Sequence, residues 1–214
     1  CAVVRLDHAQ VLLSCDALVE GIHFKRAWAA PEIIGGKAAA AALSDIAAMG
    51  GEARFMLVMC SCPPDVSDTY MTRLFQGLHA VARDHGVQVV GGDTVASPQG
   101  LVIDVAVVGA IPEGGRALRR SGACPGDVIA VTGRPGRACL GLKALEKGDT
   151  MPEDFIRAHL QPQPRLAIGR ALARNKNVHA LIDISDGVLQ DVGHIAEKSG
   201  HGITLDSDRL PITR

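Results

Sequence analysis

The stretch Leu43-Ser44-Asp45-Ile46-Ala47-Ala48-Met49-Gly50-Gly51 decides how this chain folds. It closes an alanine-rich run that begins after Pro31-Glu32 and stops at two glycines. Proline and an acidic residue suit the first turn of a helix, alanine its interior and glycine its end, so we expect a helix from about Pro31. Asp45 is out of place in so closely packing a helix unless a cation lies beside it, because burying an unpaired charge is expensive. The other interpretation is that Asp45 faces water near the helix end.

The composition excludes several classes of protein. Of the 214 residues, 47% are hydrophobic and 21% charged, which is ordinary for a soluble globular chain of one large or two modest domains. A net charge of -1 gives no electrostatic attraction to nucleic acid or to an anionic membrane. With 3% aromatic residues, the chain also has few side chains on which the bases of single-stranded nucleic acid could stack. We find no membrane-spanning run and no secretory leader, and the six cysteines lack metal-site spacing. We therefore expect a cytoplasmic protein with no nucleic-acid or membrane partner.

Apolar runs alternate with amphipathic segments along the chain, which predicts an α/β or α+β architecture. The expected strands span residues 11–14, 55–60, 87–90, 101–111, 127–132 and 178–184, and the further expected helices span residues 65–85, 138–147, 164–174 and 188–198. The uninterrupted apolar run at 55–60 suits a strand covered on both faces. Polar, glycine-rich sequence from Pro112 to Gly126 interrupts the rhythm. We place a domain boundary there, between residues 1–112 and 113–214.

An aspartate follows the carboxyl end of several expected strands, at Asp16, at Asp93, and at Asp183 with Asp186. Ligand sites gather at such strand ends in open α/β sheets. Converging carboxylates repel one another unless cations hold them, and oxygen ligands without histidine or cysteine favour Mg²⁺. Neighbouring hydroxyls could complete the site, namely Ser14, Ser44, Thr94 and Ser185. For any one of these aspartates helix capping is the favoured explanation, but the four together favour metal binding.

Glycines beside these aspartates favour a phosphate ligand. Gly91-Gly92 before Asp93, and Gly187 after Asp186, allow close backbone approach to a phosphate chain, although turns use the same residues. Neither G-x-x-x-x-G-K-[ST] nor G-x-G-x-x-G occurs, so this is not a P-loop or Rossmann nucleotide site.

Basic residues and one histidine add further candidates. Arg116, Arg119 and Arg120 form the densest basic cluster, which suits either polyphosphate charge or a solvated linker. His23 lies between Ile22 and Phe24 and is either a substrate contact or a core histidine. We find no pattern for a covalent nucleophile.

Five stretches together resemble the thiamine-monophosphate kinases, of the superfamily that includes aminoimidazole ribonucleotide synthetase, selenophosphate synthetase and a hydrogenase maturation protein. The matching stretches are Ser14-Cys15-Asp16 with Glu20-Gly21-Ile22-His23-Phe24, Leu43-Ser44-Asp45-Ile46-Ala47-Ala48-Met49-Gly50, Gly91-Gly92-Asp93-Thr94, Arg120-Ser121-Gly122-Ala123 through Pro125-Gly126-Asp127, and Ile182-Asp183-Ile184-Ser185-Asp186-Gly187. They cover nearly the whole chain in the expected order. The paired motifs G-[IV]-H-F and S-D-x-A-A-M-G distinguish this family from its relatives.

The resemblance implies a two-domain aminoimidazole ribonucleotide synthetase-like fold that dimerises through its amino-terminal sheet and has a truncated C-terminal α/β domain. The implied reaction is ATP-dependent phosphorylation of thiamine monophosphate to thiamine diphosphate by direct in-line transfer. ATP and several Mg²⁺ ions would lie between the domains, and K⁺ is a further candidate ion.

Each implied role falls on a numbered residue of this chain. Metal-site positions are matched by Asp16, Asp45, Asp93, Asp183, Asp186, Ser14 and Cys15. Nucleotide contacts are matched by Gly92, Asp93, Arg120, Ser185 and Phe75, and a substrate contact by His23. Among these we expect Asp45, Asp93 and Arg120 to act in catalysis.

Two departures from the family leave alternatives open. The family carries G-D-D just before the residues matching Cys1-Ala2-Val3-Val4 and continues past Arg214, so we expect little or no activity from residues 1–214 alone. Cys15 stands where threonine is usual, which changes a hydroxyl ligand. The alternatives are another phosphoryl-transfer enzyme, similar to selenophosphate synthetase, and an inactive nucleotide-binding scaffold.

Overall fold

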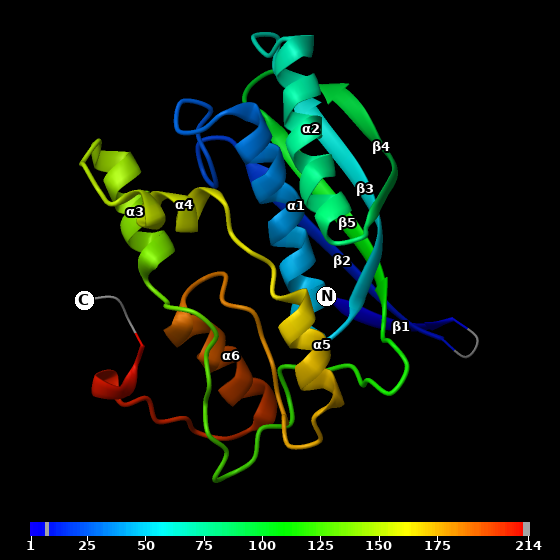
Figure 1. Cartoon of the computed structure of the whole chain (residues 1–214), viewed down its shortest axis with the longest axis vertical. Helices are drawn as coiled ribbons and strands as arrows, with labels where there is room; N and C mark the ends of the chain where they lie inside the picture. Colours follow the sequence, from blue (N-terminus) through cyan, green and yellow to red (C-terminus); the bar gives the residue numbers. More distant parts are fainter. Residues whose placement is uncertain (7–8, 212–214) are drawn as a thin grey trace.

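The first half of the chain folds into a five-stranded sheet with two helices on one face. The computed structural model describes residues 1–6 and 9–211. The strands are β1 (Ala2–Leu6), β2 (Ala9–Val19), β3 (Glu52–Cys62), β4 (Gln88–Ala96) and β5 (Val102–Ala110), in the order β1-β2-β5-β3-β4. β3 and β4 run parallel, and the other pairs are antiparallel. Helices α1 (Pro31–Ala48) and α2 (Asp68–Asp84) pack together over this sheet (Figure 1).

Helix α1 forms where the alanine-rich run predicts it. Pro31 is its first residue, and Gly50 follows its end with a φ of 71°, a left-handed conformation that suits glycine. Ile34, Leu43 and Ile46 are at most 1% exposed, and α1 contacts α2 and α5 as well as the sheet, so it is buried on more than one side. Each such side chain contributes roughly 1.5–3 kcal/mol to folding by its burial.

Two glycines bring α1 and α2 into close contact. A Cβ added at Gly35 of α1 would collide with the Leu74 carbonyl, and one added at Gly77 of α2 would collide with the Glu32 carbonyl. Because neither backbone can withdraw from the other, these two positions set how closely the helices pack. The helix layer that results buries the inner face of the sheet.

The other face of the sheet is open, which corrects the expectation for residues 55–60. Met56, Val58 and Cys60 of β3 are buried beneath the helices, whereas Phe55 and Leu57 are 44% and 46% exposed on the opposite side. The strand is apolar on both faces, yet among the described residues only one face is covered by helices. Buried and exposed residues therefore alternate along β3, as is typical of a sheet with one covered face, and the expectation that both faces are covered is wrong.

The second half of the chain is mainly helical. It contains α3 (Arg137–Lys147), α4 (Glu153–Leu160), α5 (Leu166–Arg174), α6 (Val188–Ser199) and a short 3-10 helix, η1 (Ser207–Arg209). Helices α3 and α4 pack closely, since a Cβ at Gly141 would collide with the Phe155 carbonyl. Helix α5 packs on α1 at Gly169, where an added Cβ would collide with the Ala47 carbonyl. The division into residues 1–112 and 113–214 stays a prediction.

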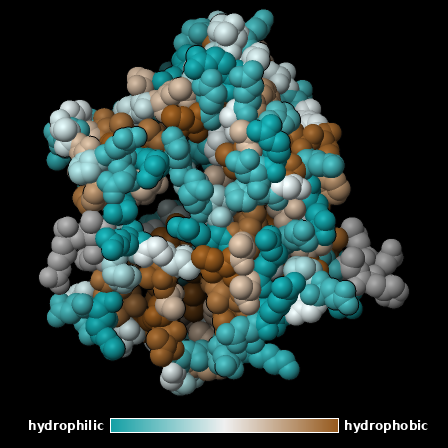
Figure 2. Space-filling view, in the orientation of Figure 1, coloured by the Kyte–Doolittle hydropathy of each residue, from teal (hydrophilic) through white to brown (hydrophobic). Residues whose placement is uncertain are grey.

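Two expectations for this half are wrong, and one helix was missed. Residues 127–132 and 178–184 form no strand, and α4 was not expected. A strand needs a neighbour to pair its backbone groups, and within the described chain no strand lies beside either stretch. Apolar side chains from both stretches, among them Val128 and Val178, line a hollow of about 910 Å³ beside α6. Figure 2 shows hydrophobic side chains around a hollow in the lower half of the molecule.

None of the described helices is long and apolar enough to cross a membrane.

Candidate active site

Acidic and basic side chains meet at a hollow of about 460 Å³ where the two halves of the chain touch. Asp45 of α1 and Asp183, in the loop before α6, line it on the acidic side. Arg119, Arg120 and Lys198 also line it. This pairing of carboxylates with cationic groups suits a ligand that carries both phosphate and bound cations.

Asp45 lies in the last turns of α1 and is half-buried rather than turned out to water. The Ser14 hydroxyl donates a hydrogen bond to Asp45 Oδ2. Ser14 comes from β2, on the side of that strand that faces α1 together with the buried residues Leu12 and Leu18. The helix and the strand therefore place a hydroxyl and a carboxylate side by side.

Two more carboxylates approach Asp45. The pKa of Asp16 is raised by burial first, and also by the negative charges of Asp45 and Asp183. Burial likewise raises the pKa of Asp183, and Asp45 adds to this, while the Ser44 hydroxyl donates to Asp183 Oδ2 at 2.8 Å and opposes it. Asp16 and Asp183 are therefore near enough to Asp45 to be repelled by its charge.

This donor set fits a divalent cation. Asp16, Asp45 and Asp183 offer hard oxygen atoms, two serines lie beside them, and their mutual repulsion is what a bound cation relieves. Mg²⁺ suits such a set better than Zn²⁺, because no histidine or thiolate belongs to it. Asp16 differs from the expectation in one respect, since it lies inside β2 rather than beyond its end.

Asp93 is not brought to this cluster. It lies inside β4, not past its end, and it pairs with Met59 of β3, which in turn pairs with Asp104 of β5. Met59 is 36% exposed on the open face of the sheet, so Asp93 belongs to that face. The Asp93 carboxylate accepts the Thr94 N–H at 2.8 Å. Gly92 is required by packing, because a Cβ there would collide with the Val58 carbonyl.

Cys15 also lies on the open face. Its thiol donates to Asp104 Oδ1 at 2.8 Å. This hydrogen bond is the main reason that the pKa of Cys15 is raised to about 11, and burial adds to the effect. The thiol therefore keeps its proton at neutral pH and acts as a hydrogen-bond donor, whereas a metal ligand would be a thiolate. Asp104 is a carboxylate that the sequence reasoning missed.

His23 is exposed, which excludes the core interpretation. The backbone N–H of Val19 donates to His23 Nδ1 at 3.0 Å, so Nδ1 is the acceptor and Nε2 carries the proton of the neutral ring. Lys37 of α1 donates to the His23 carbonyl at 2.9 Å and so holds the loop that carries His23. The ring thus presents an N–H donor to solvent from a fixed loop.

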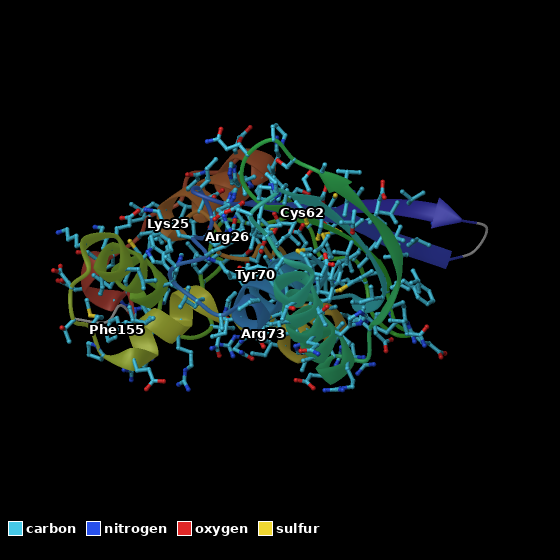
Figure 3. All side chains as sticks on the ribbon, turned by 90° about the horizontal axis from the view of Figure 1, so that it is seen from above. Lys25, Arg26, Cys62, Tyr70, Arg73 and Phe155 are labelled. Atoms are coloured by element: carbon cyan, nitrogen blue, oxygen red, sulfur yellow. The ribbon has the colours of Figure 1, made fainter. Side chains whose placement is uncertain are left out.

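A partly exposed ion-pair network fixes the base of the loop that carries His23. Arg26 donates to Glu20 Oε1 at 2.6 Å and to Asp65 Oδ2 at 2.7 Å, and Glu20 Oε2 accepts the Leu101 N–H at 2.9 Å. Figure 3 shows Arg26 close to Tyr70 of α2. The loop is thereby tied to β5 and to the start of α2.

The arginines divide into two roles. Arg119 and Arg120 line the hollow, whereas Arg116 donates to the backbone carbonyls of Val178 and Asn175 and is therefore a structural residue.

Phe75 does not line the hollow that Asp45 and Arg120 line. It lines a separate surface hollow of about 660 Å³ along α2, with His79 as a ring neighbour at 6.5 Å.

Comparison with known proteins agrees with this arrangement. Models described as AIR synthase related protein, N-terminal domain and C-terminal domain, match residues 1–111 and 124–214. Thiamine-monophosphate kinase of Bacillus subtilis is 38% identical over 210 residues, covering 95% of this chain and 64% of that protein. The Aquifex aeolicus thiamine-monophosphate kinase is 34% identical over 216 residues, covering 99% and 68%. This chain belongs to the thiamine-monophosphate kinase family.

The fold of that family is confirmed by a solved structure. AaThiL complexed with AMPPCP and TMP superimposes with a TM-score of 0.86 at 32% identity, over 93% of this chain and 63% of that one. The expected two-domain fold similar to aminoimidazole ribonucleotide synthetase is therefore correct. The chain spans a little under two thirds of the Bacillus subtilis relative's length, at 64%.

One residue beside the family motif I-D-I-S-D-G escaped the sequence reasoning. Asp191 of α6 is 2% exposed, and its Oδ2 accepts the N–H groups of Ser185, Asp186 and Gly187 at 3.1, 3.2 and 3.1 Å. The Gly187 amide therefore donates to Asp191, while the approach of phosphate to this glycine stays a prediction. An acidic residue four positions after Gly187, in the first turn of a helix, was the available signal.

The side chains of Ser185 and Asp186 remain exposed in this loop. Gln190 donates to Asp186 Oδ2 at 3.3 Å. Neither side chain lines the hollow that Asp45 lines. Of the two aspartates in this motif, Asp183 therefore belongs to the cluster, and Asp186 lies outside it.

Proposed function

We propose that this protein phosphorylates thiamine monophosphate to thiamine diphosphate, with ATP as the phosphoryl donor. The observation that supports it most is that Asp45 and Asp183 line one hollow with Arg119 and Arg120, while Asp16 is close enough to both carboxylates to be repelled by them. A site of that composition handles polyphosphates, and the relative AaThiL has been solved with AMPPCP and TMP.

We propose that Asp16, Asp45 and Asp183 hold Mg²⁺, with Ser14 and Ser44 hydrogen-bonded to two of these carboxylates. Bound Mg²⁺ supplies charge neutralisation to the phosphate oxygens. Asp93, Asp186 and Cys15 stay predicted metal-site residues. K⁺ stays a prediction to which we assign no residue.

The proposed reaction is a direct in-line transfer. A phosphate oxygen of thiamine monophosphate forms a bond to the γ-phosphorus of ATP, while the bond from that phosphorus to the bridging oxygen breaks and its electron pair leaves with ADP. The attacking oxygen is already anionic near neutral pH, so no strong general base is needed. The main barrier is repulsion between two anions, which Arg120 reduces by its charge.

Two further residues position the reactants in this proposal. The Nε2–H of His23 is free to donate to the acceptor phosphate, while Val19 and Lys37 keep its ring and loop in place. Ser185 and Phe75 stay predicted nucleotide contacts.

We also infer that a second copy of this chain covers the open face of the sheet. Phe55, Leu57 and Val90 are 44%, 46% and 55% exposed there, and a contiguous apolar face of this kind typically marks an interface. Asp93 and Cys15 lie on the same face, so a partner would bring its own side chains toward them.

We propose the cytoplasm as its location. All six cysteines are free thiols, which fits a reducing compartment where ATP is abundant. The alternatives of a selenophosphate-synthetase-like enzyme and an inactive scaffold gain less support, because the relatives from Bacillus subtilis and Aquifex aeolicus are thiamine-monophosphate kinases.

An ATP-consumption assay with thiamine monophosphate tests the proposal. We expect Asp45→Asn to lower kcat by about a hundredfold or more, because the amide keeps the shape but removes the charge that holds a cation. Asp68→Asn, an exposed aspartate in the first turn of α2, is the matched control and should keep activity. Full activity of Asp45→Asn at saturating Mg²⁺ would refute the metal role of Asp45, and no turnover by the full-length wild-type protein would refute the function.

A further inference from the structure

The most deeply buried acidic group of the described residues is Asp191, and it contacts no cation. It lies in the first turn of α6 and is 2% exposed. A carboxylate in this position is costly unless hydrogen bonds satisfy it. Three consecutive backbone amides, those of Ser185, Asp186 and Gly187, all donate to the same oxygen, Oδ2.

Such a run of amides around one anion is the arrangement by which loops elsewhere bind phosphate. In this chain the anion belongs to the protein itself, so the loop is closed on its own helix. The N-terminal end of α6 adds a favourable field for the same charge. Gly187 has a φ of 113°, which only glycine adopts readily, and this conformation lets the third amide turn toward Asp191.

The loop that Asp191 holds carries three of the predicted site residues. At its start, Asp183 accepts the Ser44 hydroxyl at 2.8 Å and lines the Asp45 hollow. At its end, the backbone of residues 185–187 is attached to Asp191. The loop is therefore fixed at both ends, by a serine of α1 and by an aspartate of α6.

We propose that Asp191 is a positioning residue, whose carboxylate shapes the loop that presents Asp183, Ser185 and Asp186 to metal and nucleotide. The proposal rests on the proposed function for the identity of the nucleotide. It assigns Asp191 no contact with substrate, and its effect passes entirely through three backbone hydrogen bonds.

The first test needs no variant. In hydrogen exchange of the wild-type protein without nucleotide, the amides of Ser185, Asp186 and Gly187 should exchange much more slowly than exposed loop amides such as that of Gly114. Free exchange at all three amides would overturn the proposal even if every variant failed to fold.

The second test compares Asp191→Asn, which keeps one oxygen acceptor but loses the charge, with Asp191→Leu, which keeps neither. Calorimetry with Mg²⁺ and AMPPCP should show binding weakened by about tenfold or more, and further for leucine than for asparagine. Amide exchange at residues 185–187 should accelerate in the same order. Asp68→Asn removes an equivalent charge from the first turn of α2 and should change neither.

Kinetics then separate positioning from general damage. Asp191→Asn should raise KM for ATP and the Mg²⁺ requirement, while KM for thiamine monophosphate changes little. Faster exchange with unchanged AMPPCP binding would overturn the proposal, because the loop would then matter for structure alone. If the wild type does not turn over thiamine monophosphate, the exchange and AMPPCP results still decide the role of Asp191.

Discussion

His23 shows how one backbone amide determines what a side chain can do. Because the Val19 N–H donates to Nδ1, the proton of the neutral ring is on Nε2, and the ring offers a donor to solvent. Asparagine places its amide near the position of Nδ1, whereas glutamine reaches the position of Nε2. The two substitutions therefore separate the atom that holds the loop from the atom that faces the substrate.

We predict that His23→Gln keeps most of the affinity for thiamine monophosphate and His23→Asn loses it. Loss of a hydrogen bond to a charged phosphate costs about 1.5–3 kcal/mol, so KM should rise on the order of tenfold to a hundredfold in His23→Asn. Steady-state kinetics with thiamine monophosphate as the varied substrate measures this. Equal KM values for the two variants would show that Nε2 does not contact the substrate.

Lys37 makes a prediction about pH. Burial lowers the pKa of Lys37 from 10.5 to about 8, and its ammonium faces His159 of α4, whose own pKa burial lowers to about 4. Between pH 8 and 10.5 the unfolded chain binds a proton at Lys37 that the folded chain does not. The free energy of unfolding should therefore gain a contribution that rises with pH over this window.

Denaturant unfolding at several pH values, with Lys37→Met as the reference, measures that contribution. The cysteines also titrate in this range, but they are common to both proteins and cancel in the difference. The stability of the wild type relative to Lys37→Met should rise from pH 8 to 10.5. A difference independent of pH throughout would contradict the lowered pKa.

At the scale of elements, the contact between α1 and α2 depends on two residues without side chains. We predict that Gly77→Ala destabilises the protein by about 1–3 kcal/mol, because its Cβ would collide with the Glu32 carbonyl and force the helices apart. Gly193→Ala in α6 is the matched control. Nothing lies within 4 Å of its added Cβ, so this change should stabilise α6 by about 0.5–1 kcal/mol.

Chemical denaturation of both variants gives the two values. A neutral Gly77→Ala would mean that the helices can separate freely, and close packing against Glu32 would then not explain the glycine at this position.

Helices with local signals could be predicted, and so could the strands expected at 55–60, 87–90 and 101–111, but whether an apolar stretch finds a strand partner could not. Helices α1, α2, α3, α5 and α6 were expected because periodicity, proline and glycine act within a few residues. The stretches 127–132 and 178–184 carry strand-like residues, but pairing depends on a neighbour that no local pattern specifies. Helix α4 is eight residues long and too short for its periodicity to stand out.

The same distinction applies to the site. Asp45 and Asp183 were found because each lies in a recognisable motif, and the fold brings them to one hollow. The face on which Asp93 lies depends on strand register, including a bulge between Met56 and Leu57, and register was not predictable from the sequence. Asp191 was missed because its importance lies in three backbone hydrogen bonds, and its one signal, an acidic residue in the first turn of a helix, is shared with positions such as Asp68 of α2.

At the scale of the whole molecule, the open face of the sheet carries the last prediction. If a second copy covers it, a charge placed there should separate the copies, because burying an unpaired carboxylate is far costlier than exposing it to water. Leu57, 46% exposed at the middle of β3, is the position to change. We predict that Leu57→Glu halves the mass measured by light scattering and leaves helix content unchanged.

Ile168 of α5 provides the control, since it is 38% exposed but lies away from the sheet, and Ile168→Glu should keep the mass of the wild type. Activity adds a second readout, because Asp93 and Cys15 share the face that a partner would cover. A monomeric Leu57→Glu protein that retains full turnover would limit the interface to a structural role. A wild type that is already monomeric at micromolar concentration would show that the apolar face serves something other than self-association.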